Sequence, residues 1–258
     1  MASPDHVATL ASLHRIRPRQ HRATIPAQVR DILHRLILTG KMQTGERIVE
    51  RQLARELGVG TPTIREALHA LEDEGLVVRH ARQGCFVATL SEKECHQIYR
   101  MRTVLEVLAA EMAVERRAHW KPEALLAALA ELKKAAQKND VERFFQSDLQ
   151  LHLNLWRLSG SAFLIKALTQ ITVPLFAFTS IRMYKKNIVD LNVSASAHER
   201  VVAAVISGSS RNAKRATQWA LEGFWHNEQA VLAETGNTVF TGKRRGLRIL
   251  KKPEGEVL

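Results

Sequence analysis

A carboxylate and an imidazole stand four residues apart in the segment FQSDLQLHLNLW, residues 145–156. If this segment is helical, Asp148 and His152 lie one turn apart on the face that also carries Phe145, Leu155 and Trp156. This face is apolar, and polar groups buried there without partners would be costly. A direct Asp–His hydrogen bond would satisfy both groups. A divalent metal ion held by the carboxylate oxygen and the imidazole nitrogen would do so as well, and the spacing leaves both interpretations open.

The elements that must position this pair are predicted to be helices. Ser91 and Glu94 form a capping-box pattern that begins the first of them, and Asp140 can cap the helix that holds the pair. The 3.6-residue period of apolar side chains then predicts helices over 91–118, 122–138, 140–160, 161–184, 197–207 and 212–233. Pro174 is expected to kink one of them. The sequence therefore predicts an all-helical bundle over residues 91–236.

Residues 46–87 show a different order of elements. A short helix over 50–57 is ended by Gly58, and a second helix starts near Pro62 with Thr61 as its cap. Two strands, 76–79 and 85–88, flank the turn 81–84. A plain helical hairpin with a charged surface could share parts of this pattern, but the whole order favours a winged helix-turn-helix over residues 23–90. The predicted fold class is mainly α, an N-terminal winged helix-turn-helix followed by the helical bundle.

Composition indicates a polyanionic partner. The chain of 258 residues has a formal net charge of +12, and the excess is concentrated in a basic arm, residues 1–22, and a basic tail, residues 237–258. Each could be solvated and flexible or could contact phosphates. The sequence shows no signal peptide, no apolar run long enough for a membrane and only two cysteines, Cys85 and Cys95. We expect a cytoplasmic protein with reduced thiols and no membrane partner.

Residues 45–87 resemble the DNA-binding segment of GntR-type bacterial transcription regulators. The matching residues are GER at 45–47, LA at 53–54, LGV at 57–59, IREAL at 64–68, Leu71, GLV at 75–77 and GCFV at 84–87. The resemblance implies that Arg51 and Arg65 touch the operator and that Gly84 lies where the wing approaches the minor groove. Thr61 and Thr63, in the first turn of the second helix, are further candidate contacts, although Gly60-Thr61 replaces the Ser-Arg of the family pattern.

The helical part resembles the FCD effector domain of FadR-like GntR regulators. The resemblance implies that Asp148, His152 and His198 hold a divalent metal ion, zinc or nickel. His226 is the nearest histidine to the family's fourth ligand, six residues beyond the expected position. Arg102, four residues before a glutamate, matches an arginine that faces a pocket for a small carboxylate effector. A structural ion pair is the alternative role for Arg102.

These features together predict a homodimeric transcription regulator, more often a repressor in this family, which binds palindromic double-stranded DNA and responds to a small carboxylate effector. Two other classes of function compete with it. The three metal-ligand candidates could hold the zinc of a hydrolase, although the chain has no HExxH motif and no evident general base. The basic ends would also suit a ligand-independent architectural DNA binder, which would not need the buried polar site. We expect the protein not to be an enzyme.

Overall fold

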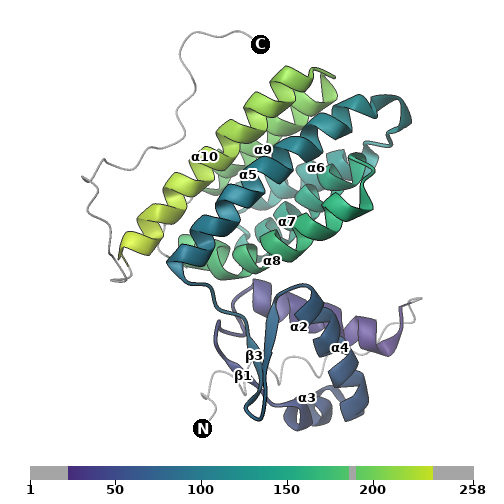
Figure 1. Ribbon diagram of the computed structural model, residues 1–258, viewed down its shortest axis with the longest axis vertical. Coiled ribbons are helices and arrows are strands. Elements are labelled where there is room, and N and C mark those ends of the chain that lie inside the picture. Colours follow the sequence, from purple (N-terminus) through teal and green to yellow (C-terminus); the bar gives the residue numbers. More distant parts are fainter. Residues whose placement is uncertain (1–22, 186–189, 235–258) are drawn as a thin grey trace. The chain divides into compact units, whose positions relative to one another are not determined.

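The computed structural model describes residues 23–185 and 190–234. The described part is mainly helical with one small antiparallel sheet (Figure 1), and this confirms the predicted fold class. Two compact units can be distinguished in it, residues 23–90 with 169–181 and residues 91–168 with 182–185 and 190–234. The predicted basic arm and basic tail lie outside the described residues.

The first unit is a winged helix-turn-helix. Its elements are, in chain order, α2 (Ile25–Leu38), β1 (Arg47–Ile48), α3 (Glu50–Leu57), α4 (Thr61–Asp73), β2 (Val77–His80) and β3 (Gly84–Val87). β3 pairs antiparallel with both β1 and β2, so it lies in the middle of the sheet. Leu33, Ile64 and Leu68 are fully buried where α2 packs against α4. Burial of this apolar core stabilises the unit and fixes the direction of α4.

The turn between α3 and α4 lies where the sequence predicts it. α3 ends at Gly58, whose φ of 65° is a left-handed conformation that glycine adopts without strain. α4 is capped by Gly60 and begins at Thr61, so Thr61 is the first helical residue rather than the predicted cap. Pro62 fits this position because an N–H in the first turn has no partner within the helix.

The wing and the N-terminal part of this unit differ in detail from the prediction. β2 begins one residue later than predicted, and β3 begins one residue earlier. Two elements, α2 and β1, were not predicted at all. β1 adds a third strand because the backbone around Arg47 and Ile48 pairs with Phe86 and Cys85 of β3. β3 is therefore hydrogen-bonded along both of its edges, to β1 on one side and to β2 on the other.

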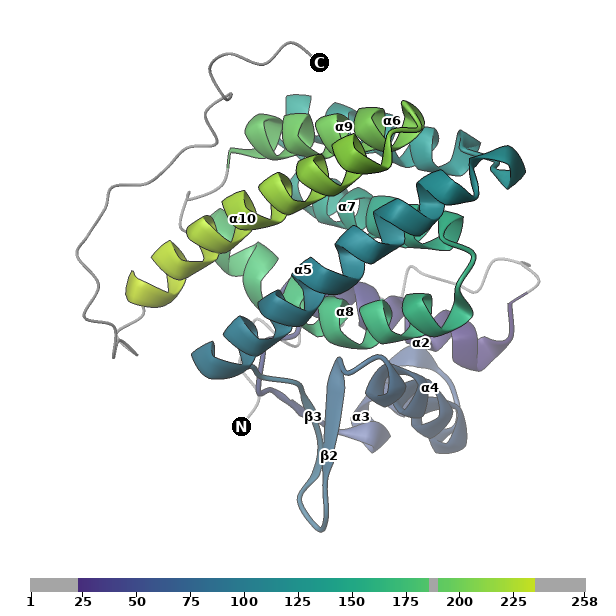
Figure 2. The ribbon, with the colours of Figure 1, turned by 45° about the horizontal axis from the view of Figure 1, so that its top comes forward.

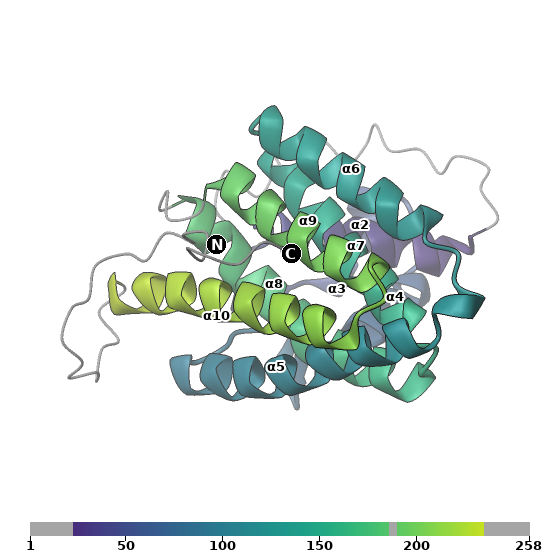
Figure 3. The ribbon, with the colours of Figure 1, turned by 90° about the horizontal axis from the view of Figure 1, so that it is seen from above.

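The second unit is built from helices. In chain order these are α5 (Glu92–Glu115), a short 3₁₀ turn (Arg117–His119), α6 (Glu123–Gln137), α7 (Val141–Leu158), α8 (Ala162–Lys185), α9 (Leu191–Ile206) and α10 (Ser210–Glu234). Only the two ends of α8 belong to this unit, because residues 169–181 group with the first unit. α5 and α10 run side by side, as Figures 1 and 3 show. α7 packs against both α5 and α6, and α9 packs against α6 and α10 (Figure 2). α7 is therefore surrounded by other helices, and half of its residues are buried.

Local capping explains where these helices start. The predicted capping box is present, with Ser91 and Glu94 bonded to each other's backbone. The Asp140 side chain caps α7, also as predicted. α9 starts at Leu191, six residues before the predicted start, because the Asp190 side chain accepts hydrogen bonds from two backbone N–H groups of its first turn. No helix in the described part of the chain is long and apolar enough to cross a membrane.

Candidate metal and effector site

α7 carries both Asp148 and His152. The predicted apolar face exists: Phe145, Asp148, His152, Leu155 and Trp156 are all less than 10% exposed. The helix is amphipathic, and its buried face turns toward α5 and α6. A carboxylate and an imidazole are therefore held one turn apart inside the helical unit, where both need partners.

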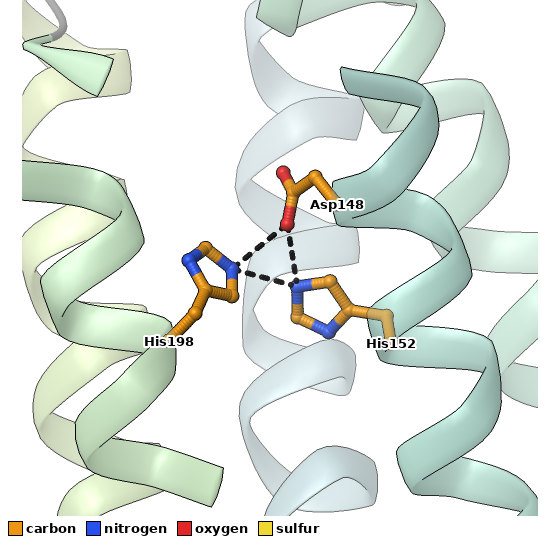
Figure 4. A group of neighbouring side chains, drawn as sticks. All are labelled: Asp148, His152 and His198. Carbon is orange, nitrogen blue, oxygen red and sulfur yellow. Dashed lines mark hydrogen bonds and ion pairs between the residues drawn. The ribbon is translucent and has the colours of Figure 1, made fainter. Parts of the chain in front are cut away.

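His198 of α9 completes a group of three. One ligand atom from each of Asp148, His152 and His198 lies within 4.8 Å of the other two, and Figure 4 shows the three side chains converging. The His198 Nε2 atom is 2.8 Å from Asp148 Oδ1 and 3.3 Å from His152 Nε2. His152 Nε2 is 3.6 Å from the same carboxylate oxygen. The structure thus brings together three of the four residues that the sequence named as metal ligands.

In both histidines, the ring nitrogen that faces away from the group lies close to an oxygen atom, which orients the ring. The Nδ1 atom of His198 is 2.7 Å from the Ser194 carbonyl oxygen, and the Nδ1 atom of His152 is 3.1 Å from Glu106 Oε2. Each oxygen lies beside an Nδ1 atom, so Nε2 is the ring nitrogen that faces the centre of the group. Imidazole rings that bind a metal ion are commonly oriented in this way.

The charges in the group are strongly coupled. Burial alone would raise the pKa of Asp148, but its neighbours His198, His152 and Arg102 together outweigh burial, and the pKa is lowered. Burial likewise would lower the pKa of His198, but the Asp148 carboxylate raises it. Without a metal ion, the Asp148–His198 contact is a buried ion pair. A proton and a metal ion would compete for the same His198 nitrogen.

Arg102 and Glu106 of α5 flank the histidines. Both are almost fully buried, and the Arg102 Nε atom donates to Glu106 Oε1. The Nη2 atom of Arg102 is 3.3 Å from His152 Nε2, and its guanidinium lies 5.0 Å from the centre of the Phe224 ring. Burial would raise the pKa of Glu106, but the charges of Arg102 and His152 outweigh it and lower the pKa to about 2. Arg102 therefore has both the predicted place beside the metal-ligand candidates and the alternative role of an ion-pair partner.

His226 does not join the group. Among the described residues, the potential ligands that gather there are only Asp148, His152 and His198. His226 lies on α10, is exposed, and has its Nδ1 atom 2.6 Å from the Glu222 carbonyl oxygen. Three protein ligands with an open position are the arrangement in which water or a bound molecule can complete a metal site.

The candidate DNA contacts lie on the helix-turn-helix and the wing. Arg65 of α4 is 60% exposed, and its Nε atom donates to Glu50 Oε2 at 2.7 Å. Arg51 of α3 is exposed, while Thr61 and Thr63 at the start of α4 are half-buried. Gly84 begins β3 at the exposed wing turn.

Sequence reasoning did not find three residues that take part in these sites. Glu106 was seen only as the neighbour of Arg102, although it also orients His152. Glu50 holds Arg65, and the Arg47 side chain approaches the backbone of Gly84. The one available signal was the four-residue spacing of Arg102 and Glu106. This spacing predicts an ion pair but does not tell which neighbouring helix the pair faces. The other contacts join residues 15 or more positions apart.

Comparisons with known proteins agree with this division of the chain. Residues 26–87 match the family described as bacterial regulatory proteins, gntR family, and residues 97–222 match the FCD domain. A probable D-xylose utilization operon transcriptional repressor of Paenarthrobacter nicotinovorans is 26% identical over 77% of this chain and 86% of its own length. An uncharacterized HTH-type transcriptional regulator in the TAR-I ttuE-ttuC' intergenic region of Agrobacterium vitis is 30% identical over 46% of this chain and 71% of its own length.

Other similarities are shorter or structural. The HTH-type regulator YdhC of Bacillus subtilis, itself uncharacterized, is 40% identical over 32% of this chain, and the match spans 37% of YdhC. Among solved structures, E. coli McbR/YncC superposes with a TM-score of 0.69 at 20% identity, covering 83% of this chain and all of that chain. At this identity the superposition supports the fold.

Proposed function

We propose that this chain, which belongs to the gntR family of bacterial transcription regulators and carries an FCD domain, is a homodimeric repressor controlled by a small carboxylate effector. The observation that supports effector control is the buried group of Asp148, His152 and His198 with Arg102 beside it. The relative named as a probable D-xylose utilization operon transcriptional repressor supports the direction of regulation. The family itself makes the hydrolase hypothesis the less favoured one.

A divalent metal ion fits the three ligands. Two nitrogens bound to one tetrahedral zinc ion are about 3.3 Å apart, and the two histidine Nε2 atoms are separated by 3.3 Å. The shorter 2.8 Å contact between Asp148 and His198 would lengthen slightly on metal binding. Zinc and nickel both accept such mixed nitrogen and oxygen ligands. Bound there, the metal would supply a positive Lewis-acid centre with a coordination position for an anionic oxygen.

The count of buried charges favours an anionic effector. A divalent ion and Arg102 bring three positive charges, and Asp148 and Glu106 bring two negative ones. One positive charge would then be left uncompensated, which is costly in a buried site. A carboxylate placed between the metal ion and Arg102 would cancel it, and its two oxygens could engage both. Arg102 thus has the role of recognising the effector, and Glu106 holds Arg102 in place.

The winged helix-turn-helix would read the operator. α4 is the helix that enters a major groove in such folds, and its exposed Arg65 is the strongest candidate for a base contact. Arg51, Thr61, Thr63 and the Gly84 wing turn would position the unit on the backbone and minor groove. Two copies related by a two-fold axis would bind a palindrome of two half-sites. Effector binding would change how tightly the dimer holds both half-sites.

The test begins with protein purified without chelator. Metal analysis should find about one divalent ion per chain, and mass spectrometry should identify any small acid that is released. Carboxylates are then titrated into a complex of the protein with operator DNA, with fluorescence anisotropy as the readout. An active effector should release wild-type protein from DNA, whereas Arg102→Ala, shown by circular dichroism to remain folded at the assay temperature despite the loss of Glu106's partner, should bind DNA and not respond. The proposal would be refuted if wild-type protein purified in this way contained no metal ion and if no carboxylate released it from DNA.

A further inference from the structure

An apolar stripe is exposed on one face of α5. Met101, Val104 and Leu108 are 45%, 66% and 42% exposed, and their spacing of three and four residues places them in one row along the helix. The opposite face of α5 is buried and carries Arg102 and Glu106. Apolar side chains scattered singly on a surface are ordinary, but a row of three on one helix face is typical of an interface.

The charges on the same face have an ordered arrangement. With 100° of rotation per residue, Lys93, Arg100, Glu111 and Glu115 all lie within about 40° of Val104 around the helix. The basic pair precedes the apolar row and the acidic pair follows it. Glu111 contacts Lys214, while Lys93 and Glu115 are exposed and have no ion-pair partner among the described residues.

This order is complementary to itself in the antiparallel direction. If two copies of α5 cross with a two-fold axis at Val104, each residue faces the one equally far on the other side of Val104. Val104 then meets its own copy, Arg100 lies near Leu108, and Lys93 faces Glu115, since 93 and 115 are both eleven positions from 104. A parallel pairing would instead bring each charge against its like. Opposite charges at the rim and apolar contacts at the centre describe a stable, specific interface.

We propose that this face of α5 is the surface on which a second copy of the chain packs, antiparallel, with Val104 on the two-fold axis. The proposal rests on the homodimer of the proposed function and names the surface that makes it. The apolar row is the energetic centre of the interface, and the Lys93–Glu115 contacts occur twice because of the two-fold symmetry.

A cysteine on the axis tests the geometry. In full-length protein, Val104→Cys should cross-link to its own copy under oxidising conditions or with a short bis-maleimide, because symmetry brings the two side chains together. The two native cysteines, Cys85 and Cys95, are 3% and 0% exposed and should not react. Leu126→Cys is the matched control, since Leu126 is 44% exposed on α6 and lies outside the row. Equal cross-linking of both variants, or none of Val104→Cys, would overturn the proposal.

Equilibrium sedimentation tests the energetics. Leu108→Lys should raise the dimer dissociation constant at least 100-fold, while Leu126→Lys should leave it within about twofold, with circular dichroism showing that both variants fold. Lys93→Glu should weaken the dimer by severalfold, and adding Glu115→Lys should restore it, because the double change re-creates the opposite-charge contact. No rescue would refute the antiparallel register. Wild-type protein that is monomeric both free and on operator DNA would refute the homodimer itself, whereas a dimer insensitive to these α5 changes would refute the surface alone.

Discussion

Replacement of Glu106 by glutamine should destabilise the helical unit by about 3 kcal/mol at neutral pH. Glutamine has nearly the shape of the carboxyl group but cannot compensate the charge of Arg102. A carboxyl whose pKa is about 2 in the folded chain and 4.5 in the unfolded chain contributes about 3 kcal/mol to the free energy of unfolding when ionised. Removal of one partner from a buried ion pair typically costs a similar amount, about 3 to 5 kcal/mol.

The pH dependence of this stability loss shows whether the charge of Glu106 causes it. Because the pKa of Glu106 is lowered on folding, its contribution is fully present above pH 4.5 and is lost as the pH falls toward 2. The difference between wild type and Glu106→Gln should therefore shrink from about 3 kcal/mol at pH 7 to about 2 kcal/mol at pH 3.5. Urea unfolding followed by tryptophan fluorescence measures the free energy of unfolding of the helical unit. All four tryptophans belong to this unit: Trp120, Trp156, Trp219 and Trp225.

A second ion pair provides the control. Glu131 of α6 contacts Arg143, but both side chains are about half exposed, and water screens their attraction. Glu131→Gln should therefore leave the unfolding curve almost unchanged at every pH. A loss below about 1 kcal/mol for Glu106→Gln, or a larger loss that does not vary between pH 7 and 3.5, would contradict the assignment of Glu106 as the charge partner of Arg102.

Three further outcomes are expected. Arg65→Ala should cost about 1 to 3 kcal/mol of binding at the cognate operator, measured by anisotropy, and an equal loss on random DNA would make Arg65 a phosphate contact. His152→Ala should remove the metal ion, whereas His226→Ala should retain it because His226 lies outside the ligand group; metal analysis distinguishes these, and retention by His152→Ala would contradict the site. Deletion of residues 1–22 and 237–258 should flatten the salt dependence of DNA binding without changing base preference, and an unchanged slope would show that neither end contacts DNA.

The parts of the site that obey a local rule could be predicted from the sequence. Asp148 and His152 belong to one helix, so their spacing alone places them together. His198 comes from another helix 46 residues later, and only the family resemblance assigned it to the group. The role of Glu106 toward His152 depends on how α5 is rotated against α7. That rotation is a result of tertiary packing, and no periodicity in one segment determines it.

The fold shows the same division. The helix-turn-helix was predicted almost to the residue because Gly58, Pro62 and the apolar positions of α4 act locally. The start of α9 was placed too late because its first turn is rich in asparagine and serine, which have low helix propensity, and the Asp190 cap overrides this preference. α2 has the signals of a helix, with Thr24 as cap, proline in the first turn and an amphipathic pattern. The motif that was recognised begins only at residue 46, after α2 has ended.

The two faces of α5 have a consequence for how the regulator responds to the concentration of its effector. A helix is only about 10 Å across, so Arg102, the proposed effector contact, and the proposed two-fold contact at Val104 are separated by one helix diameter. If effector binding rotates α5, the partner's α5 must adjust, and with it the second effector site. Occupation of one site would then change the affinity of the other. Such a dimer would bind its effector with a Hill coefficient above one and switch its operator over a narrower concentration range than two independent sites allow.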